Sequence, residues 1–304
     1  MDKAITGIPN SSSFAMASKV KDYFQLIKFT LSFTVVFSCV VCYLLAPNIN
    51  FDFFSVVILF VAGMLITGSA NAINQAVEKD TDALMKRTAG RPVAAGRMKV
   101  NEALTFAIVA GILGIVMMWA WFNFLSAFIS LISLLLYGFV YTPLKKINSI
   151  SVLVGALPGA LPCLIGWTAG TNQLSEGGWV LFAILFFWQF PHFWAIAWVA
   201  HKDYEKAGFK LLPGAGGPTR FTALQTVIYS MLMIPVGMLP FYFQLSGIVS
   251  FWILLCCNTG MVFVSVLLLI KMNVSAARRV MFSSYFYLMI VFLSLLFDKG
   301  YITR

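Results

Sequence analysis

The sequence predicts an all-α integral membrane protein with nine transmembrane helices, and three observations support this prediction. Of its 304 residues, 60% are hydrophobic and only 11% are charged, with a mean hydropathy of +0.89, whereas soluble domains usually carry about 25% charged residues. The apolar residues form blocks of roughly twenty, the length that a helix needs to cross about 30 Å of hydrocarbon. Basic residues recur in every second connection between these blocks. Together these observations exclude an ordinary soluble core.

Nine apolar segments form the expected helices. They cover residues 25–47, 51–73, 102–121, 123–141, 149–170, 179–200, 221–243, 247–270 and 279–297. The fifth segment contains Gly155, Pro158, Gly159, Pro162 and Gly166, which favours close helix packing or a kink beside a cavity. Because the number of segments is odd, the two termini are expected on opposite sides of the membrane.

Lys and Arg residues alternate strictly between the two ends of the expected helices. They lie before the first segment and in the second-to-third, fourth-to-fifth, sixth-to-seventh and eighth-to-ninth connections, and the other four connections contain none. Because cytoplasmic loops retain Lys and Arg, this pattern predicts a cytoplasmic N-terminus and a C-terminus outside. Topology therefore accounts for the net charge of +10, and no nucleic-acid partner is predicted.

The chain is predicted to contain one membrane domain. Residues 1–20 are expected to form a flexible N-terminal tail, and residues 21–304 a single polytopic domain. Met1 to Ser18 are polar and rich in Ser, and they lack the apolar core and cleavage site of a signal peptide. The five cysteines show neither zinc-site spacing nor the pattern of a secreted disulfide framework.

An acidic run at residues 71–92 carries the strongest chemical signal. If the second helix continues through it, Asn74, Glu78 and Asp82 fall on one helical face, within about 80° of one another and spread over roughly 12 Å. Such oxygen ligands suit Mg2+, which takes one or two carboxylates plus substrate phosphates. The alternative is a solvated helix end in which Glu78 and Asp82 pair with neighbouring lysines. The position at the membrane edge, together with a second acidic loop, favours the metal site.

Basic side chains follow the acidic run within two to three turns. Lys86, Arg87 and Arg91 provide charge and donor geometry that match phosphate oxygens. Tyr141 and Lys145, at the same end of the fourth helix, add a phenol and an ammonium group, although an aromatic belt with positive-inside lysines would explain them as well. The sequence thus predicts metal ligands and phosphate ligands on one membrane face.

The second acidic loop lies within residues 188–208, at the cytoplasmic end of the sixth helix. Asp203 is the best candidate there for a further metal-binding carboxylate. His192 lies in the body of the expected helix, where an ionisable residue is a candidate for function, although a satisfied structural imidazole is the alternative. His201 fits a solvated helix end as well as a site, and the contribution of Glu205 stays open.

The chain resembles the UbiA superfamily of intramembrane prenyltransferases, and within it the branch that modifies haem. The resemblance covers nearly the whole chain. It is carried by Asn74-x-x-x-Glu78-x-x-x-Asp82 continuing into Asp-Ala-Leu-Met-Lys-Arg-Thr, by Tyr141-Thr-Pro-Leu-Lys-Lys, and by Trp188-Gln-Phe-Pro-His-Phe with Asp203-Tyr-x-x-Ala-Gly. It implies nine helices around a central cavity, with the active site facing the cytoplasm.

The resemblance also implies roles for individual residues. It implies that Mg2+ is held by Asn74, Glu78, Asp82 and Asp203, that the diphosphate is bound by Lys86, Arg87, Arg91, Lys145 and Tyr141, and that haem is bound by His192. Lys145 joins the four metal ligands as a catalytic residue. The sequence departs from quinone-precursor prenyltransferases at two positions, because Ala207 stands four residues after Asp203 and position 78 is Glu. The first departure predicts a metal site with fewer carboxylates.

The implied reaction transfers the farnesyl group of farnesyl diphosphate to a vinyl group of haem B. With addition of water it gives haem O and diphosphate, with magnesium as cofactor and a bacterial inner membrane as the expected location. A downstream haem-modifying enzyme or a terminal oxidase would take the product onward. The alternatives are a related enzyme that prenylates an aromatic quinone precursor and, from a different class, a membrane transporter, although no inverted repeat favours the transporter.

Overall fold

The computed structural model describes residues 11–214 and 217–299, which form helices and no strand. The helices, in chain order, are α1 (Ser11–Leu26), α2 (Phe29–Leu45), α3 (Phe53–Val77), α4 (Lys79–Leu84), α5 (Val100–Trp121), α6 (Phe124–Leu135), the π-helix η1 (Leu136–Tyr141), α7 (Thr142–Leu144), α8 (Ser151–Thr171), α9 (Glu176–Val199), α10 (His201–Lys206), α11 (Arg220–Tyr242), α12 (Ile248–Lys271) and α13 (Val274–Phe297). Residues 11–20 of the expected flexible tail belong to α1, and residues 1–10 lie outside the described residues.

Within residues 11–214 and 217–299, eight helices are long and apolar enough to cross a membrane. Seven are α3, α5, α8, α9, α11, α12 and α13, and the eighth is the continuous run α6–η1–α7. The first expected span is broken, because the end of α1 and α2 meet at an angle of 49°. A multi-pass, all-helical fold is therefore confirmed. The count of nine holds only if the bent pair forms one span, and the sidedness of the termini stays a prediction.

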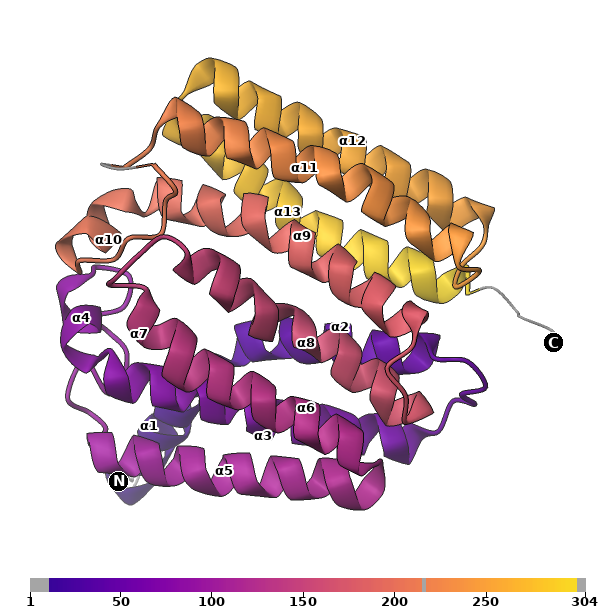
Figure 1. Ribbon diagram of the computed structural model, residues 1–304. Helices are drawn as coiled ribbons and strands as arrows, with labels where there is room; N and C mark the ends of the chain where they lie inside the picture. Colours follow the sequence, from indigo (N-terminus) through magenta and orange to yellow (C-terminus); the bar gives the residue numbers. More distant parts are fainter. Residues whose placement is uncertain (1–10, 215–216, 300–304) are drawn as a thin grey trace, which may run out of the picture.

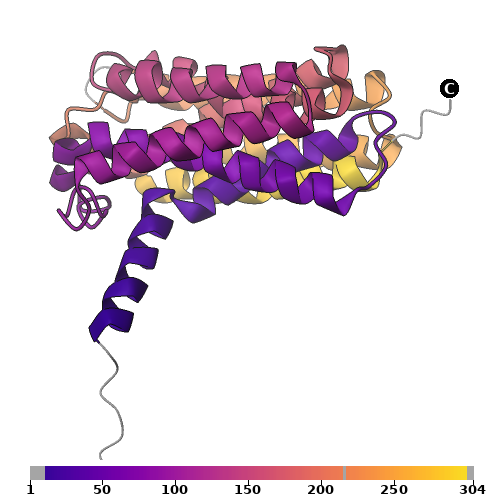
Figure 2. The same ribbon diagram turned by 90° about the horizontal axis from the view of Figure 1, so that it is seen from below.

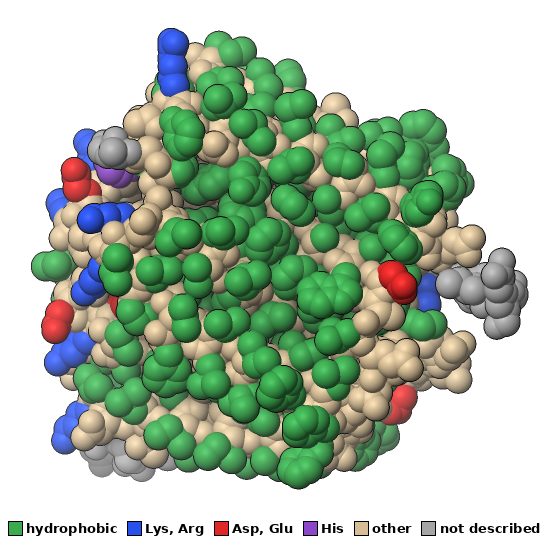
Figure 3. All heavy atoms as spheres, in the orientation of Figure 1, with side chains coloured by type: hydrophobic (Ala, Val, Ile, Leu, Met, Phe, Trp, Pro, Cys, Tyr) green, Lys and Arg blue, Asp and Glu red, His purple; other side chains and the backbone are tan. Residues whose placement is uncertain are grey.

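The long helices lie side by side in one bundle (Figure 1), and α1 projects from one end of it (Figure 2). Hydrophobic side chains cover the middle of the face in Figure 3, whereas charged side chains gather toward its two ends. An apolar band between charged ends is the surface that a bilayer requires, because a charge in hydrocarbon is costly. The short helices α4 and α10 lie at the same end of the bundle (Figure 1).

The break between α1 and α2 is stabilised by amide side chains of α3. Lys28 adopts the left-handed conformation there, with φ 48° and ψ 58°. Asn71 Nδ2 donates to the carbonyl of Ile27 at 3.2 Å, and Gln75 Nε2 donates to the carbonyls of residues 25 and 26, each at 2.9 Å. Because a carbonyl freed inside a membrane protein must find another donor, these buried amides allow the chain to bend at Lys28.

The predicted continuation of the second helix is interrupted at Glu78, which forms a turn between α3 and α4. The main-chain hydrogen bonds nevertheless continue across it: Glu78 N donates to the carbonyl of Asn74 at 2.9 Å, and Asp82 N donates to the carbonyl of Glu78 at 2.7 Å. Asn74, Glu78 and Asp82 thus keep the four-residue spacing that the sequence predicts.

The enclosed helices α8 and α9 form the centre of the bundle, and glycines of α8 allow their neighbours to approach closely. A Cβ atom at Gly166 would meet the main-chain carbonyl of Cys39 on α2, and one at Gly159 would meet the side chain of Gln189 on α9. Small residues serve this purpose in membrane bundles, where helix association depends on packing. The glycines predicted to permit close packing do so.

We expect Gly166→Ala to destabilise the protein by about 1 to 3 kcal/mol, because the added methyl group must displace main chain of α2. The matched control is Gly260→Ala on α12, where a Cβ meets nothing within 4 Å. That control should be neutral or slightly stabilising, since Ala is the better helix former. The check is the apparent melting temperature of each purified variant in detergent. Equal melting temperatures for the two variants would contradict the packing argument.

Candidate active site

A polar cavity of about 160 Å³ lies at the end of the bundle that carries α4 and α10. It is lined by Lys28, Leu31, Asn74, Glu78, Asp82, Met85, Arg87, Arg91, Tyr137, Tyr141, Lys145, Tyr204, Phe209 and Leu211. A larger hollow of about 430 Å³ lies between the α8–α9 connection and the end of α11, but Glu176 is the single charged residue in its lining. The smaller cavity is therefore the one that concentrates reactive side chains.

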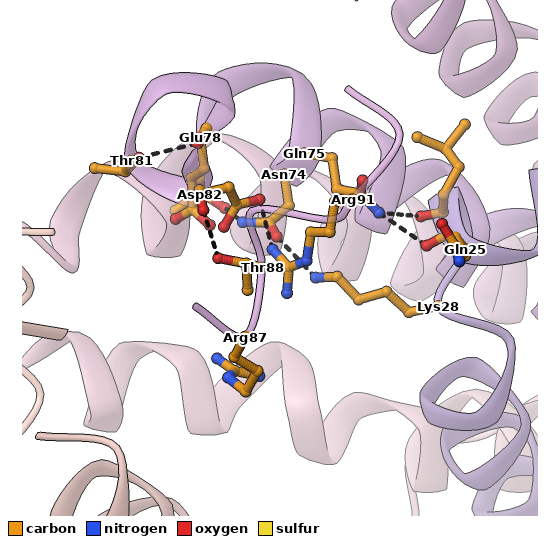
Figure 4. Close-up of polar contacts among 12 residues, drawn as sticks. Gln25, Lys28, Asn74, Gln75, Glu78, Thr81, Asp82, Arg87, Thr88 and Arg91 are labelled. Carbon is orange, nitrogen blue, oxygen red and sulfur yellow. Dashed lines mark hydrogen bonds and ion pairs between the residues drawn. The ribbon is translucent and has the colours of Figure 1, made fainter. Parts of the chain in front are cut away.

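Two buried carboxylates on neighbouring turns form the centre of this cavity, as Figure 4 shows together with Asn74, Lys28 and Arg91. Asp82 Oδ2 accepts a hydrogen bond from Arg91 Nη1 at 2.6 Å, and Glu78 Oε1 pairs with Lys145 Nζ at 2.6 Å. The Asp82 side chain is 1% exposed and that of Glu78 is 5% exposed. Because a buried charge requires a partner, these ion pairs hold the two acids in place.

Lys28 contributes a further cation from the break between α1 and α2. Its Nζ donates to Asn74 Oδ1 at 2.8 Å, while Asn74 Nδ2 lies 3.4 Å from the hydroxyl of Thr142. The bend described above is what turns this lysine toward α3. The break in the first span therefore adds one positively charged side chain to the cavity.

Aromatic rings of three elements form the wall of the cavity around two of its cations. Lys145 Nζ lies 4.8 Å from the ring centroid of Tyr141 and 5.4 Å from that of Phe209. Arg87 Nη2 donates to the hydroxyl of Tyr204 at 3.0 Å, which joins the loop after α4 to α10. Rings beside cations stabilise positive charge through their quadrupoles.

The π-helix η1 supplies Tyr137 and Tyr141 to this wall. A π-helical turn is rare and occurs mostly at functional sites. Here the hydroxyl of Thr142 donates to the carbonyl of Tyr137 at 2.9 Å, and Pro143, which follows, has no N–H of its own to donate. The sequence Tyr-Thr-Pro thus accounts locally for the irregular end of this span.

The donor set fits a magnesium ion that is shared with a phosphate ligand. Asp82 Oδ1 is buried and has no hydrogen-bond partner, and Glu78 Oε1 has its ion pair with Lys145 but no hydrogen bond of good geometry. Within the described residues, no group of three or more Asp, Glu, His or Cys side chains is close enough to hold a metal alone. Mg2+ typically takes one or two carboxylates and completes its shell with phosphate and water.

The cavity brings together most of the residues that the sequence singles out. Asn74, Glu78, Asp82, Arg87, Arg91, Tyr141 and Lys145 all line it. Three predicted residues do not: Lys86 is exposed on the same loop, Asp203 is half-buried one residue before Tyr204, and His192 lies within α9. Of the three carboxylates predicted to bind the metal, Glu78 and Asp82 line the cavity and Asp203 does not.

Four polar or aromatic residues of the lining are absent from the sequence prediction: Lys28, Tyr137, Tyr204 and Phe209. Lys28 could have been identified from the sequence, because an ionisable residue within an apolar segment is a candidate for function. Tyr204 directly follows the predicted Asp203, so the sequence identifies this segment but not Tyr204 as a residue of the cavity lining. Tyr137 and Phe209 resemble ordinary apolar residues in sequence, and only the fold brings them to the site.

Comparison with known proteins agrees with this geometry. Residues 35–295 match the UbiA prenyltransferase family. A protoheme IX farnesyltransferase from Cytophaga hutchinsonii is 44% identical over 94% of this chain and 100% of its own, and one from Flavobacterium johnsoniae is 38% identical over 95% and 97%.

Solved structures share the fold at low sequence identity. A digeranylgeranylglyceryl phosphate synthase superposes with a TM-score of 0.77 at 21% identity, covering 92% of this chain and 98% of the other. A UbiA homologue from Archaeoglobus fulgidus bound to GPP and Mg2+ gives a TM-score of 0.68 at 18% identity, with coverages of 90% and 99%. On the family match and the curated relatives, this chain belongs to the UbiA prenyltransferase family.

Proposed function

We propose that this protein transfers the farnesyl group of farnesyl diphosphate to a vinyl group of haem B, with addition of water, and releases haem O and diphosphate. One observation carries the proposal: a buried pair of carboxylates with an unpartnered oxygen lies in one cavity with four basic side chains. The similarity to protoheme IX farnesyltransferases supports farnesyl diphosphate and haem as the substrates.

Departure of the diphosphate is the step for which this cavity is suited. The residues Lys28, Arg87, Arg91 and Lys145 outnumber the acids Glu78 and Asp82, so the cavity favours a strongly anionic group. These cations stabilise the negative charge that grows on the diphosphate as the allylic C–O bond breaks, which is the differential stabilisation that catalysis requires. Asn74, Glu78 and Asp82 would hold Mg2+, which when bound supplies further charge neutralisation at the same oxygens.

The aromatic wall is suited to the allylic cation that this step produces. The rings of Tyr137, Tyr141 and Phe209, together with Leu31 and Leu211, line the cavity beside the ionic cluster. Ring faces stabilise positive charge, and apolar side chains keep water from capturing the cation early. The electron-rich vinyl group then forms the new C–C bond, and water adds to the resulting porphyrin-conjugated cation and loses one proton to solvent, which leaves the hydroxyl group.

The remaining site assignments belong to the same proposal. Asp203, half-buried at the start of α10, would approach the metal–diphosphate complex from the loop that carries Tyr204, and Lys86 would contact its outer oxygens. His192 is assigned to the haem acceptor. The positive-inside pattern supports a cavity open to the cytoplasm. The membrane is assigned as a bacterial inner membrane, from which haem O would pass to a downstream haem-modifying enzyme or a terminal oxidase.

We expect Asp82→Asn to reduce farnesyl transfer by on the order of 10²-fold or more, because it removes the charge that would bind the metal. The matched control is Asp80→Asn, which neutralises an exposed carboxylate of the same short helix outside the cavity and should retain normal turnover. The measurement is formation of haem O by mass spectrometry from haem B, farnesyl diphosphate and Mg2+, with both variants first shown to be monodisperse in detergent. Normal rates in the Asp82 variant would refute the metal-site assignment.

We also expect chelation with EDTA to abolish turnover and added Mg2+ to restore it in a saturable manner, because Asp82 Oδ1 is buried without a hydrogen-bond partner and suits a divalent cation. Binding of farnesyl diphosphate, measured by calorimetry with and without Mg2+, gives an independent readout. Equal affinity under both conditions would show that the lysines and arginines bind the diphosphate without a metal. Replacing haem B by an aromatic quinone precursor in the same assay tests the alternative acceptor.

A further inference from the structure

The hydroxyl group of Ser284 on α13 lies between two polar partners inside the bundle. Ser284 is fully buried. Its Oγ lies 2.6 Å from the carbonyl of Met281, one turn earlier on the same helix, and 2.7 Å from Nδ1 of His192 on α9. Both contacts are short enough to be strong hydrogen bonds.

The two contacts of the Ser284 hydroxyl favour one tautomer of His192. A hydroxyl group has one hydrogen, and a main-chain carbonyl can only accept. If the Ser284 hydrogen is donated to Met281, its oxygen accepts the second hydrogen bond from His192 Nδ1–H, and this is the arrangement in which both contacts are hydrogen bonds. In a neutral imidazole with the proton on Nδ1, the other nitrogen, Nε2, keeps its lone pair.

Aromatic side chains fix the orientation of the same imidazole ring. Trp188 stacks on it with centroids 4.6 Å apart and an interplanar angle of 16°, and Tyr285 meets it edge-on at 5.1 Å. Trp188 Nε1 in turn donates to the main-chain carbonyl of Ser284 at 2.9 Å. Since an imidazolium among these rings would be a buried charge with no ion pair to a carboxylate of residues 11–214 or 217–299, the neutral ring is the expected form.

His192 Nε2 makes no hydrogen bond with the described residues, in contrast to Nδ1. A neutral histidine that donates Nδ1–H to an oxygen and offers Nε2 has the arrangement that proteins use to bind iron, with the oxygen setting the direction and basicity of the ring. His192 lies about two turns before the end of α9, and α9 leads directly into α10, which carries Tyr204 of the cavity.

We propose that Ser284 is a positioning residue that holds His192 as the Nδ1–H tautomer and thereby presents Nε2 as an axial ligand to the iron of the porphyrin acceptor. This inference rests on the proposed function for the identity of the acceptor, whereas the tautomer does not depend on it. Ser284 itself touches neither the iron nor the farnesyl group in this arrangement.

The tautomer can be measured directly, because the chain contains only two histidines. In a His201→Gln background, 15N-histidine labelling leaves His192 as the single signal in a nuclear magnetic resonance spectrum. We expect Nδ1 to be protonated and Nε2 to have the shift of an unprotonated imidazole nitrogen. In Ser284→Ala the Nδ1–H tautomer should no longer be the major form in the spectrum. Ser284→Thr, which keeps the hydroxyl, should restore it as the major form. A protonated Nε2 in the wild-type ring would overturn the inference.

Binding of haem B, followed by its absorbance spectrum without farnesyl diphosphate, tests the consequence. Ser284→Ala should weaken haem binding by about 10- to 100-fold and alter the spectrum, as expected for loss of a group that orients a metal ligand, and Ser284→Thr should restore both. His192→Ala should lose the histidine-ligated spectrum. The matched control is Ser294→Ala, which removes a similar hydroxyl that donates to the carbonyl of Val291 on the same helix.

The outcomes separate this inference from the proposed function. If the wild-type protein converts haem B but Ser284→Ala and His192→Ala bind haem with unchanged spectra, the axial-ligand inference is wrong and the farnesyl transfer stands. If the wild-type protein binds haem through His192 but forms no haem O, the proposed function fails and the role of Ser284 stands. Calorimetric binding of farnesyl diphosphate with Mg2+ should be the same in all of these variants.

Discussion

The structure depends on the neutralisation of charge at the boundary between an apolar bundle and water. Glu78 and Asp82 are almost completely buried, and they are held there by Lys145 and Arg91 at 2.6 Å. Without these partners each carboxylate would be an uncompensated buried charge, which costs several kcal/mol. The elements that supply the partners, the loop after α4 and the end of the α6–η1–α7 span, must therefore meet α3 at one place.

The same requirement explains the irregular helices around the cavity. The bend at Lys28 frees carbonyl groups that Asn71 and Gln75 satisfy, and at the end of the π-helix the carbonyl of Tyr137 accepts both the main-chain N–H and the hydroxyl of Thr142. In a membrane such departures persist only where other donors replace the lost bonds. Both irregularities direct a charged or aromatic residue into the cavity, so they contribute to the site as well as to the fold.

The sequence predicts the apolar spans well, because a transmembrane helix needs about twenty apolar residues and this pattern is visible without a structure. It also identifies Asn74, Glu78 and Asp82, whose four-residue spacing survives the turn at Glu78. It does not reveal that the first span is broken, because the bend depends on amides that α3 provides from a distance. Nor does it reveal Tyr137 and Phe209 as cavity residues, since aromatic residues of this kind are common throughout the chain. Asp203 is predicted as a site residue because it lies in an acidic loop. In the structure its neighbour Tyr204 lines the cavity.

The ion pairs of the cavity also have a consequence for the order in which ligands arrive. Lys145 already pairs with Glu78 and Arg91 with Asp82, so a divalent cation that enters alone weakens both ion pairs and leaves an ammonium and a guanidinium group poorly compensated. A cation that enters already complexed to a phosphorylated lipid brings new oxygens to which both side chains can turn. Electrostatics therefore favours joint entry of the two ligands over stepwise entry.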